Sequence, residues 1–178
     1  MRLFVAVELP APIRDAIEQH VRSLPAVPNV RWSRTATHVT LRFLGDTAPE
    51  RVPDLTTALD TVGHPGFTAI LGAAGQFPPH GRARVLWWGF TDPSSFASLA
   101  RAVDQALALP QDPRAFHPHV TIGRCHRPVR FPRELADVPA LGSFAVEEFS
   151  LFESTLGPTA VHTPIARFAL SNVTQSSP

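Results

Sequence analysis

Two histidine–threonine pairs are the residues of this chain best suited to chemistry. His38 and Thr40 lie in the stretch HVTL, and His119 and Thr121 lie in the stretch HVTI. An imidazole titrates near neutral pH, so one histidine can accept a proton while another donates one. The threonine hydroxyls can donate hydrogen bonds to oxygens on which negative charge develops. The four side chains together predict acid–base catalysis at a phosphodiester, and this chemistry requires no metal.

Both stretches have the composition of β-strands, in which residues two apart share a face. His38 and Thr40 are therefore expected to point one way, while Val39 and Leu41 point into the core. The second stretch repeats this pattern. If the two strands lie side by side, two imidazoles and two hydroxyls converge in one groove.

Both stretches also lie in segments that contain arginines and no acidic residue. The net charge of +1 does not by itself indicate a nucleic-acid-binding protein, but all 16 basic side chains are arginines and their distribution is uneven. Such segments attract anions such as phosphate, and Arg124 is the candidate for a direct phosphate contact. The arginines of the two acid-free segments are Arg22, Arg31, Arg34 and Arg42 in the first, and Arg114, Arg124, Arg127, Arg130 and Arg133 in the second.

Length and composition indicate one domain, or two closely packed halves, formed by residues 1–178. Hydrophobic residues make up 44% of the 178, which is enough for a core. Cys125 is the only cysteine, so no internal disulfide is expected. The apolar start MRLFVAVELP is interrupted by Glu8 and is too short for a signal peptide, and no apolar run has the length of a membrane span. We expect a cytoplasmic protein with no membrane partner.

Hydrophobic spacing and proline positions predict an α+β fold with largely antiparallel sheets. A helix followed by an HVT strand occurs in each half, which suggests two related lobes, and the end of the chain, about 174–178, is expected to be loose. Predicted helices cover 10–24, 49–62 and 92–107. Predicted strands cover 2–9, 29–34, 37–44, 67–76, 84–90, 118–124, 144–153 and 161–170.

The stretches HVTLRFLG and FHPHVTIGR resemble the paired HxTx signatures of the 2H phosphoesterases. More narrowly, they are similar to those of the bacterial and archaeal RNA 2′,3′-cyclic phosphodiesterases, long named 2′-5′ RNA ligases. The opening MRLFVAVELP and the closing FESTLGPTAVHTPIARFAL resemble the same family. The resemblance implies a bilobal α+β fold with two mainly antiparallel sheets that form a central groove. The helices pack outside, and a pseudo-twofold axis relates the lobes.

The resemblance also implies an activity, which is the opening of RNA 2′,3′-cyclic phosphate ends to 2′-phosphates without metal or cofactor. His119 then corresponds to the base on water and His38 to the acid on the 3′ oxygen, although the residues alone leave these roles open to exchange. Thr40, Thr121 and Arg124 correspond to substrate-binding positions. A weak, reversible 2′-5′ ligation is a further implied activity. His162 departs from the family pattern, because an aromatic residue is common there.

Several alternatives remain open at the level of sequence. The substrate could be a general RNA end, a tRNA fragment or a cyclic nucleotide, and no obligatory protein partner is evident. The same groove would serve an RNA-end-binding or ligase-like module in which hydrolysis is incidental. A metal-dependent hydrolase could use His117, His119 and His126, although carboxylates are missing from that segment.

Aromatic residues near the two stretches could stack on a nucleobase. Adjacent residues of a strand point to opposite faces, so only one of the two neighbouring tryptophans can line a given groove. The candidates are Trp32, Phe43, Phe77, Trp87 and Trp88.

Overall fold

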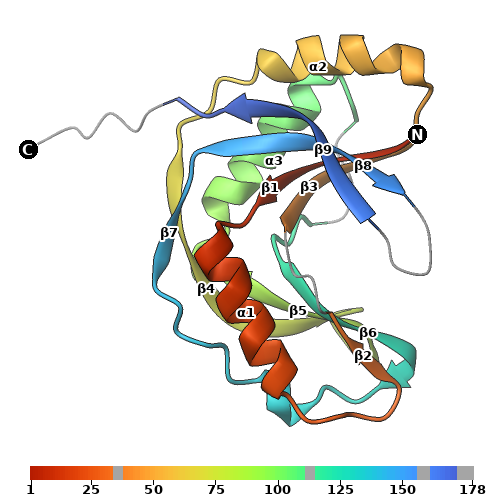
Figure 1. The fold of residues 1–178 in the computed structure, drawn as a ribbon, viewed down its shortest axis with the longest axis vertical. Coiled ribbons are helices and arrows are strands. Elements are labelled where there is room, and N and C mark those ends of the chain that lie inside the picture. The colour runs from red at the N-terminus through yellow and green to blue at the C-terminus, as the bar shows by residue number, and fades with distance from the viewer. Residues whose placement is uncertain (34–37, 111–114, 156–160, 172–178) are drawn as a thin grey trace, which may run out of the picture.

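The computed structural model describes residues 1–33, 38–110, 115–155 and 161–171 (Figure 1). Arg34, Arg114 and the tail about 174–178, on which predictions were made above, lie outside the described residues. The described chain folds into two antiparallel sheets and three α-helices, which confirms the predicted α+β class.

The four-stranded sheet has the order β3-β1-β8-β9. Its central strand β1 is almost wholly apolar because it is covered on both faces, and Leu3, Val5 and Val7 on one face are each no more than 1% exposed. Ala6, on the other face, lies opposite Thr40 of β3 and Ser150 of β8. The strands are β1 (Arg2–Glu8), β3 (His38–Asp46), β8 (Glu148–Thr155) and β9 (Val161–Ala169).

The five-stranded sheet has the order β2-β6-β5-β4-β7. The second HVT stretch enters it through β6, which pairs with β2 on one side and β5 on the other. The strands are β2 (Val30–Trp32), β4 (Phe67–Phe77), β5 (Ala83–Phe90), β6 (Val120–Val129) and β7 (Ser143–Val146).

The three helices form where the spacing of apolar residues predicts them. Ile13, Ile17 and Val21 of α1 (Ala11–Ser23) are buried on one face. A 3-10 turn, η1 (Pro49–Arg51), precedes α2 (Val52–Asp60), in which the proline falls in the first turn and breaks no helical hydrogen bond. The last helix, α3 (Ser94–Ala106), begins just after Asp92, whose carboxylate accepts the backbone N–H of Ser94 at 2.8 Å. A second 3-10 turn is η2 (Arg133–Leu135).

One hydrophobic core joins the two sheets and the three helices. Buried residues from β1, α1, α2, α3 and β6 all belong to a single cluster, so the two sheets are held together through their helix-covered faces. Phe4, Ala6 and Phe152 form a separate small cluster on the opposite face of the four-stranded sheet. That opposite face is the one that carries the first HVT pair.

The predicted strand 144–153 is wrong in one respect, because the chain forms two strands there. β7 pairs with β4 in the five-stranded sheet, whereas β8 pairs with β1 and β9 in the four-stranded sheet. Glu147, an exposed residue between them, is the point at which the chain passes from one sheet to the other. The apolar alternation breaks at the adjacent Glu147 and Glu148, and the single predicted strand ignored this break.

Candidate active site

The two HVT stretches lie in different sheets, so their strands do not lie side by side, which was the arrangement considered above for bringing the four side chains together. His38 begins β3, the edge strand of the four-stranded sheet, and pairs with Glu8 of β1. His119 directly precedes β6 of the five-stranded sheet. In Figure 1 the first residues of β3 and of β6 approach each other in the middle of the molecule, where the two sheets face one another.

The pKa shifts of the histidines indicate that they lie near one another. The charges of His162, His119 and Arg124 all lower the pKa of His38, after the larger effect of burial. Arg124 also lowers the pKa of His119 and of His162. Because such interactions weaken with distance, side chains from β3, β6 and β9 must share one local environment. We call His38, His119, His162 and Arg124, with the two threonines, the inter-sheet site.

His38 rests on aromatic rings of its own sheet. Its ring centroid lies 5.1 Å from that of Phe4 and 6.1 Å from that of Phe152. His162 meets it edge-on at 5.1 Å with an interplanar angle of 85°, and also lies 5.1 Å from Phe4. This apolar support desolvates the imidazole and, with the nearby cations, lowers the pKa of His38 from 6.5 to about 4.

His119 is oriented by the backbone that precedes it. Its Nδ1–H donates to the carbonyl oxygen of His117 at 2.7 Å, which leaves Nε2 of the neutral ring as an acceptor. The rings of Phe77 and Trp87 pack against it at 5.0 and 5.9 Å. Burial is the main cause that lowers the pKa of His119, and the His117 carbonyl opposes it by stabilising the protonated ring. His117 therefore orients the His119 ring through its backbone carbonyl group and not through its own side chain.

The remaining predicted residues occupy positions consistent with the same site. Strand alternation puts Thr40 on the face of His38, and the same alternation puts Thr121 on the face of His119. Both threonines are half-buried. Arg124 is exposed and lies opposite Arg31 of β2 in the pairing of β2 with β6. Within the part of the chain that the structure describes, Arg124 has no ion-pair partner.

The adjacent tryptophans point to opposite faces of β5, as strand geometry requires. Trp88 is fully buried in the core, and its Nε1–H donates to the carbonyl of Leu135 at 3.3 Å. Trp87 reaches the inter-sheet site and lies across Gly75 of the neighbouring strand.

The other aromatic candidates lie on β2 and β3. Trp32 packs over Gly123 and donates its Nε1–H to the carbonyl of Pro25 at 2.9 Å. Phe43 is the most exposed of the aromatic candidates, at 71%.

Sequence reasoning missed the rings that support the two histidines. Phe4 lies in a strand whose residues are nearly all apolar, so no pattern marks which of them faces the site. Phe152 lies in the misassigned strand. His162 was noted only as a departure from a family pattern, whereas it contacts His38 directly.

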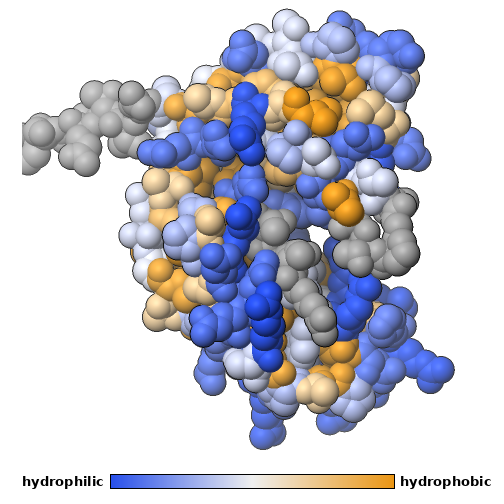
Figure 2. All heavy atoms as spheres, in the orientation of Figure 1, coloured by the Kyte–Doolittle hydropathy of each residue, from blue (hydrophilic) through white to orange (hydrophobic). Residues whose placement is uncertain are grey.

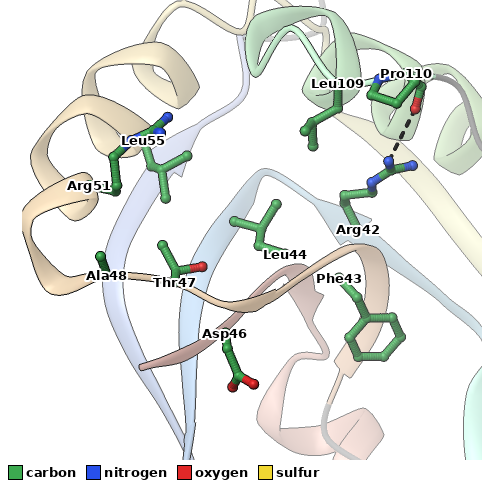
Figure 3. Close-up of a pocket in the computed structure, with 10 residues that line it drawn as sticks. All are labelled: Arg42, Phe43, Leu44, Asp46, Thr47, Ala48, Arg51, Leu55, Leu109 and Pro110. Atoms are coloured by element: carbon green, nitrogen blue, oxygen red, sulfur yellow. Dashed lines mark hydrogen bonds between the residues drawn. The ribbon is translucent and has the colours of Figure 1, made fainter.

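Figure 3 shows a cavity of about 600 Å³ that does not include either catalytic candidate. It opens at the far end of β3, between that strand, α2 and the residues after α3. Arg42 on its wall is held by Asp104 at 3.4 Å and by the carbonyl of Pro110 at 3.1 Å. Across the visible face of the molecule, hydrophilic residues border the hollow between the two sheets (Figure 2).

Two further observations bear on the class of protein. Among the described residues, no three His, Cys, Asp or Glu side chains are arranged to hold a metal ion, so the alternative that uses His117, His119 and His126 has no support in this geometry. A search of the same residues finds no helix long and apolar enough to cross a membrane.

Two HxT pairs on facing antiparallel sheets, with arginines beside them, define the class of the paired-histidine phosphoesterases. The chain belongs to the LigT-like phosphoesterase family, whose model matches residues 7–87 and 91–162. The RNA 2′,3′-cyclic phosphodiesterase of Escherichia coli K12 is 35% identical over 96% of this chain and 97% of its own. That of Archaeoglobus fulgidus is 31% identical over 89% and 93%.

Solved structures agree with this assignment. A protein of Thermus thermophilus superposes with a TM-score of 0.79 at 28% identity, covering 96% of this chain and 98% of its own. E. coli LigT in complex with 3′-AMP superposes with a TM-score of 0.75 at 33% identity, over 96% and 98%. The predicted family and fold are therefore confirmed.

Proposed function

We propose that this protein opens the 2′,3′-cyclic phosphate at an RNA end to a 2′-phosphate, using His38 and His119 and no metal. The observation that carries the proposal is that the charge of His119 lowers the pKa of His38, from a different sheet, and that the charge of Arg124 lowers the pKa of both imidazoles, each of which lies beside a threonine. The curated relatives bear the name RNA 2′,3′-cyclic phosphodiesterase, and this name supports the RNA end as substrate.

His119 is the base that activates water. Its Nδ1 proton is committed to the His117 carbonyl, so Nε2 accepts the proton from water as the water oxygen attacks phosphorus. The bond from phosphorus to the ribose 3′ oxygen breaks, and His38 protonates that oxygen. Thr40, Thr121 and Arg124 stabilise the charge that builds on the non-bridging oxygens.

His38 can act as the acid only when it is protonated, and bound substrate favours that form. With a pKa of about 4 in the free protein, His38 is neutral at neutral pH. An anionic phosphate in the inter-sheet site offsets the charge of Arg124 and favours the protonated ring. Substrate binding and proton uptake are therefore coupled in this mechanism. A 5′-hydroxyl of another RNA in place of water would give the 2′-5′ linkage by the same proton transfers.

The test is turnover of an oligoribonucleotide that ends in a 2′,3′-cyclic phosphate, assayed in a chelator, with the position of the product phosphate determined. We expect a 2′-phosphate product and a loss of about 10²–10⁴-fold in kcat for His38→Ala or His119→Ala. His126→Ala, an exposed residue further along β6, serves as the matched control and should retain activity.

The same variants separate catalysis from simple binding. If the protein is an enzyme, removing either imidazole abolishes turnover. If it is a module that only binds RNA ends, the same variants keep most of their affinity for the RNA end, and any residual turnover does not depend on the two histidines. Activity abolished by the chelator would refute the metal-free mechanism. A panel with tRNA fragments and nucleoside 2′,3′-cyclic phosphates identifies the preferred substrate.

A further inference from the structure

His162 lies in the inter-sheet site but has no part in the proposed reaction. Its ring centroid lies 5.1 Å from that of His38, at an interplanar angle of 85°. The two imidazoles come from β9 and β3, which are the two edge strands of the four-stranded sheet. They therefore meet above the middle of the sheet, where the Phe4 ring lies 5.1 Å from each of them. The fold thus brings together two titratable rings that no strand pairing connects.

The two rings differ in their access to water. His162 is exposed, whereas His38 is half-buried against Phe4 and Phe152. Because burial disfavours the charged form of an imidazole, the exposed ring binds a proton at higher pH than the half-buried one. A charged His162 then opposes a second positive charge on a ring 5.1 Å away. The charge of His162 does lower the pKa of His38, and burial is the only larger cause.

The other charged groups around His38 come from β6 and β1. His119 and Arg124 of β6 also lower the pKa of His38, and Arg124 lowers that of His162 as well. Glu8 of β1 lies opposite His38, but two arginines hold its carboxylate, at 2.7 and 3.8 Å. Arg124 is always charged, and His119 must be neutral to act as the base. Among these described groups, His162 is therefore the one whose charge can change while the proposed reaction continues.

We propose that His162 competes with His38 for one proton and thereby sets the pH at which the candidate acid becomes charged. This inference rests on the proposed function, which makes His38 the acid. His162 is then a positioning residue that acts through His38 and not on the substrate. Two interacting imidazoles take up their protons in two steps that belong to the pair, and the first proton resides mainly on the exposed ring. A neutral side chain at position 162 leaves that first proton to His38.

Titration of the histidine resonances by NMR tests this competition in the free protein. In the wild-type protein, His162 should titrate at higher pH than His38. His162→Phe keeps a ring without the charge, His162→Gln removes both, and His162→Lys keeps a charge without the ring. We expect His162→Phe and His162→Gln to raise the midpoint of the His38 titration by roughly half a pH unit or more, because charges this close interact even in water. His162→Lys should not raise it.

His126→Phe is the matched control, since His126 is exposed and lies further along β6. It removes an imidazole outside the inter-sheet site and should leave the His38 midpoint unchanged. The kcat/KM–pH profile measures the consequence for catalysis. The limb that belongs to His38 should move to higher pH in His162→Phe and in His162→Gln by the same amount as the midpoint.

Three results would overturn the proposal. One is a His38 midpoint that stays in place in both neutral variants, and another is a wild-type protein in which His38 titrates at higher pH than His162. The third is a midpoint that moves in His162→Gln and not in His162→Phe, because packing of the ring, and not its charge, would then be the cause. A wild-type protein that turned over no cyclic phosphate would refute the proposed function, while the NMR titration would still decide whether the two rings compete.

Discussion

Gly75 provides the space on which the position of His119 depends. It lies opposite Trp87 in the pairing of β4 with β5, and the indole lies flat across it. Trp87 in turn contacts Phe77 and His119, with ring centroids 5.3 and 5.9 Å away. We therefore predict that Gly75→Ala lowers activity, although Gly75 touches neither substrate nor catalytic residue.

The size of the effect follows from the clash. A methyl group at Gly75 would lie 2.7 Å from Cε2 of Trp87 and closer still to Cζ2 and Cη2, whereas ordinary contact begins at 3.4 Å. The difference sets a minimum ring shift of about 0.7 Å at Cε2. Displacing a catalytic group by about 1 Å can cost about 10²-fold in rate, and overpacking typically costs about 1–3 kcal/mol of stability.

The assay is kcat/KM on a cyclic phosphate substrate, accompanied by the free energy of unfolding from denaturant titration. Gly63→Ala is the matched control, because a methyl group there meets nothing within 4 Å and its backbone is not in the left-handed region. A double-mutant cycle with Trp87→Phe separates the clash from other effects, because phenylalanine lacks the distal indole atoms that collide.

We expect Gly75→Ala to cost about 10-fold to 100-fold in kcat/KM, Gly63→Ala to cost nothing measurable, and the Gly75→Ala penalty to shrink in the Trp87→Phe background. A Gly75→Ala protein with full activity and an unshifted His119 resonance by NMR would refute the reasoning. An equal penalty in both backgrounds would show that the indole is not the cause.

Three other predictions concern charge in the inter-sheet site. Burial and nearby cations lower the pKa values of His38 and His119, so both limbs of the kcat/KM–pH profile should lie below pH 6.5. Arg124→Gln removes one of these cations and should move both limbs to higher pH. Arg127→Gln is the control and should leave the profile unchanged. The folded protein favours the neutral form of His38, because its pKa is about 4 there and 6.5 in the unfolded chain. The free energy of unfolding should therefore fall by about 3 kcal/mol as the pH is lowered from 6.5 to 4. Unfolding titrations of wild type and His38→Gln at several pH values measure this difference. Thr40→Val and Thr121→Val should lower kcat less than removal of either histidine, because each deletes one hydrogen bond and no proton transfer, and the same turnover assay ranks them.

Much of the architecture could be predicted because local patterns match local structure. The spacing of Ile13, Ile17 and Val21 predicts the buried face of α1, and each side chain is buried there. The proline of α2 marks the first turn of that helix. The two adjacent glutamates at 147 and 148 interrupt the alternation, but the change of sheet itself could not be predicted, because alternation reports which face of a strand is buried and carries no information about which strand lies beside it.

The sequence by itself determined which chemical groups this protein has and which of them share a face of a strand. It paired each histidine with a threonine, placed arginines without acids around both, and required the adjacent tryptophans to point apart. Only the tertiary structure decided that His119, from the other sheet, comes near enough to lower the pKa of His38, and that Trp87, not Trp88, packs against His119. The physical reason is that proximity and desolvation depend on residues distant in the chain: Phe4, Phe152 and His162 come from three other strands, and their packing lowers the pKa of His38 to about 4.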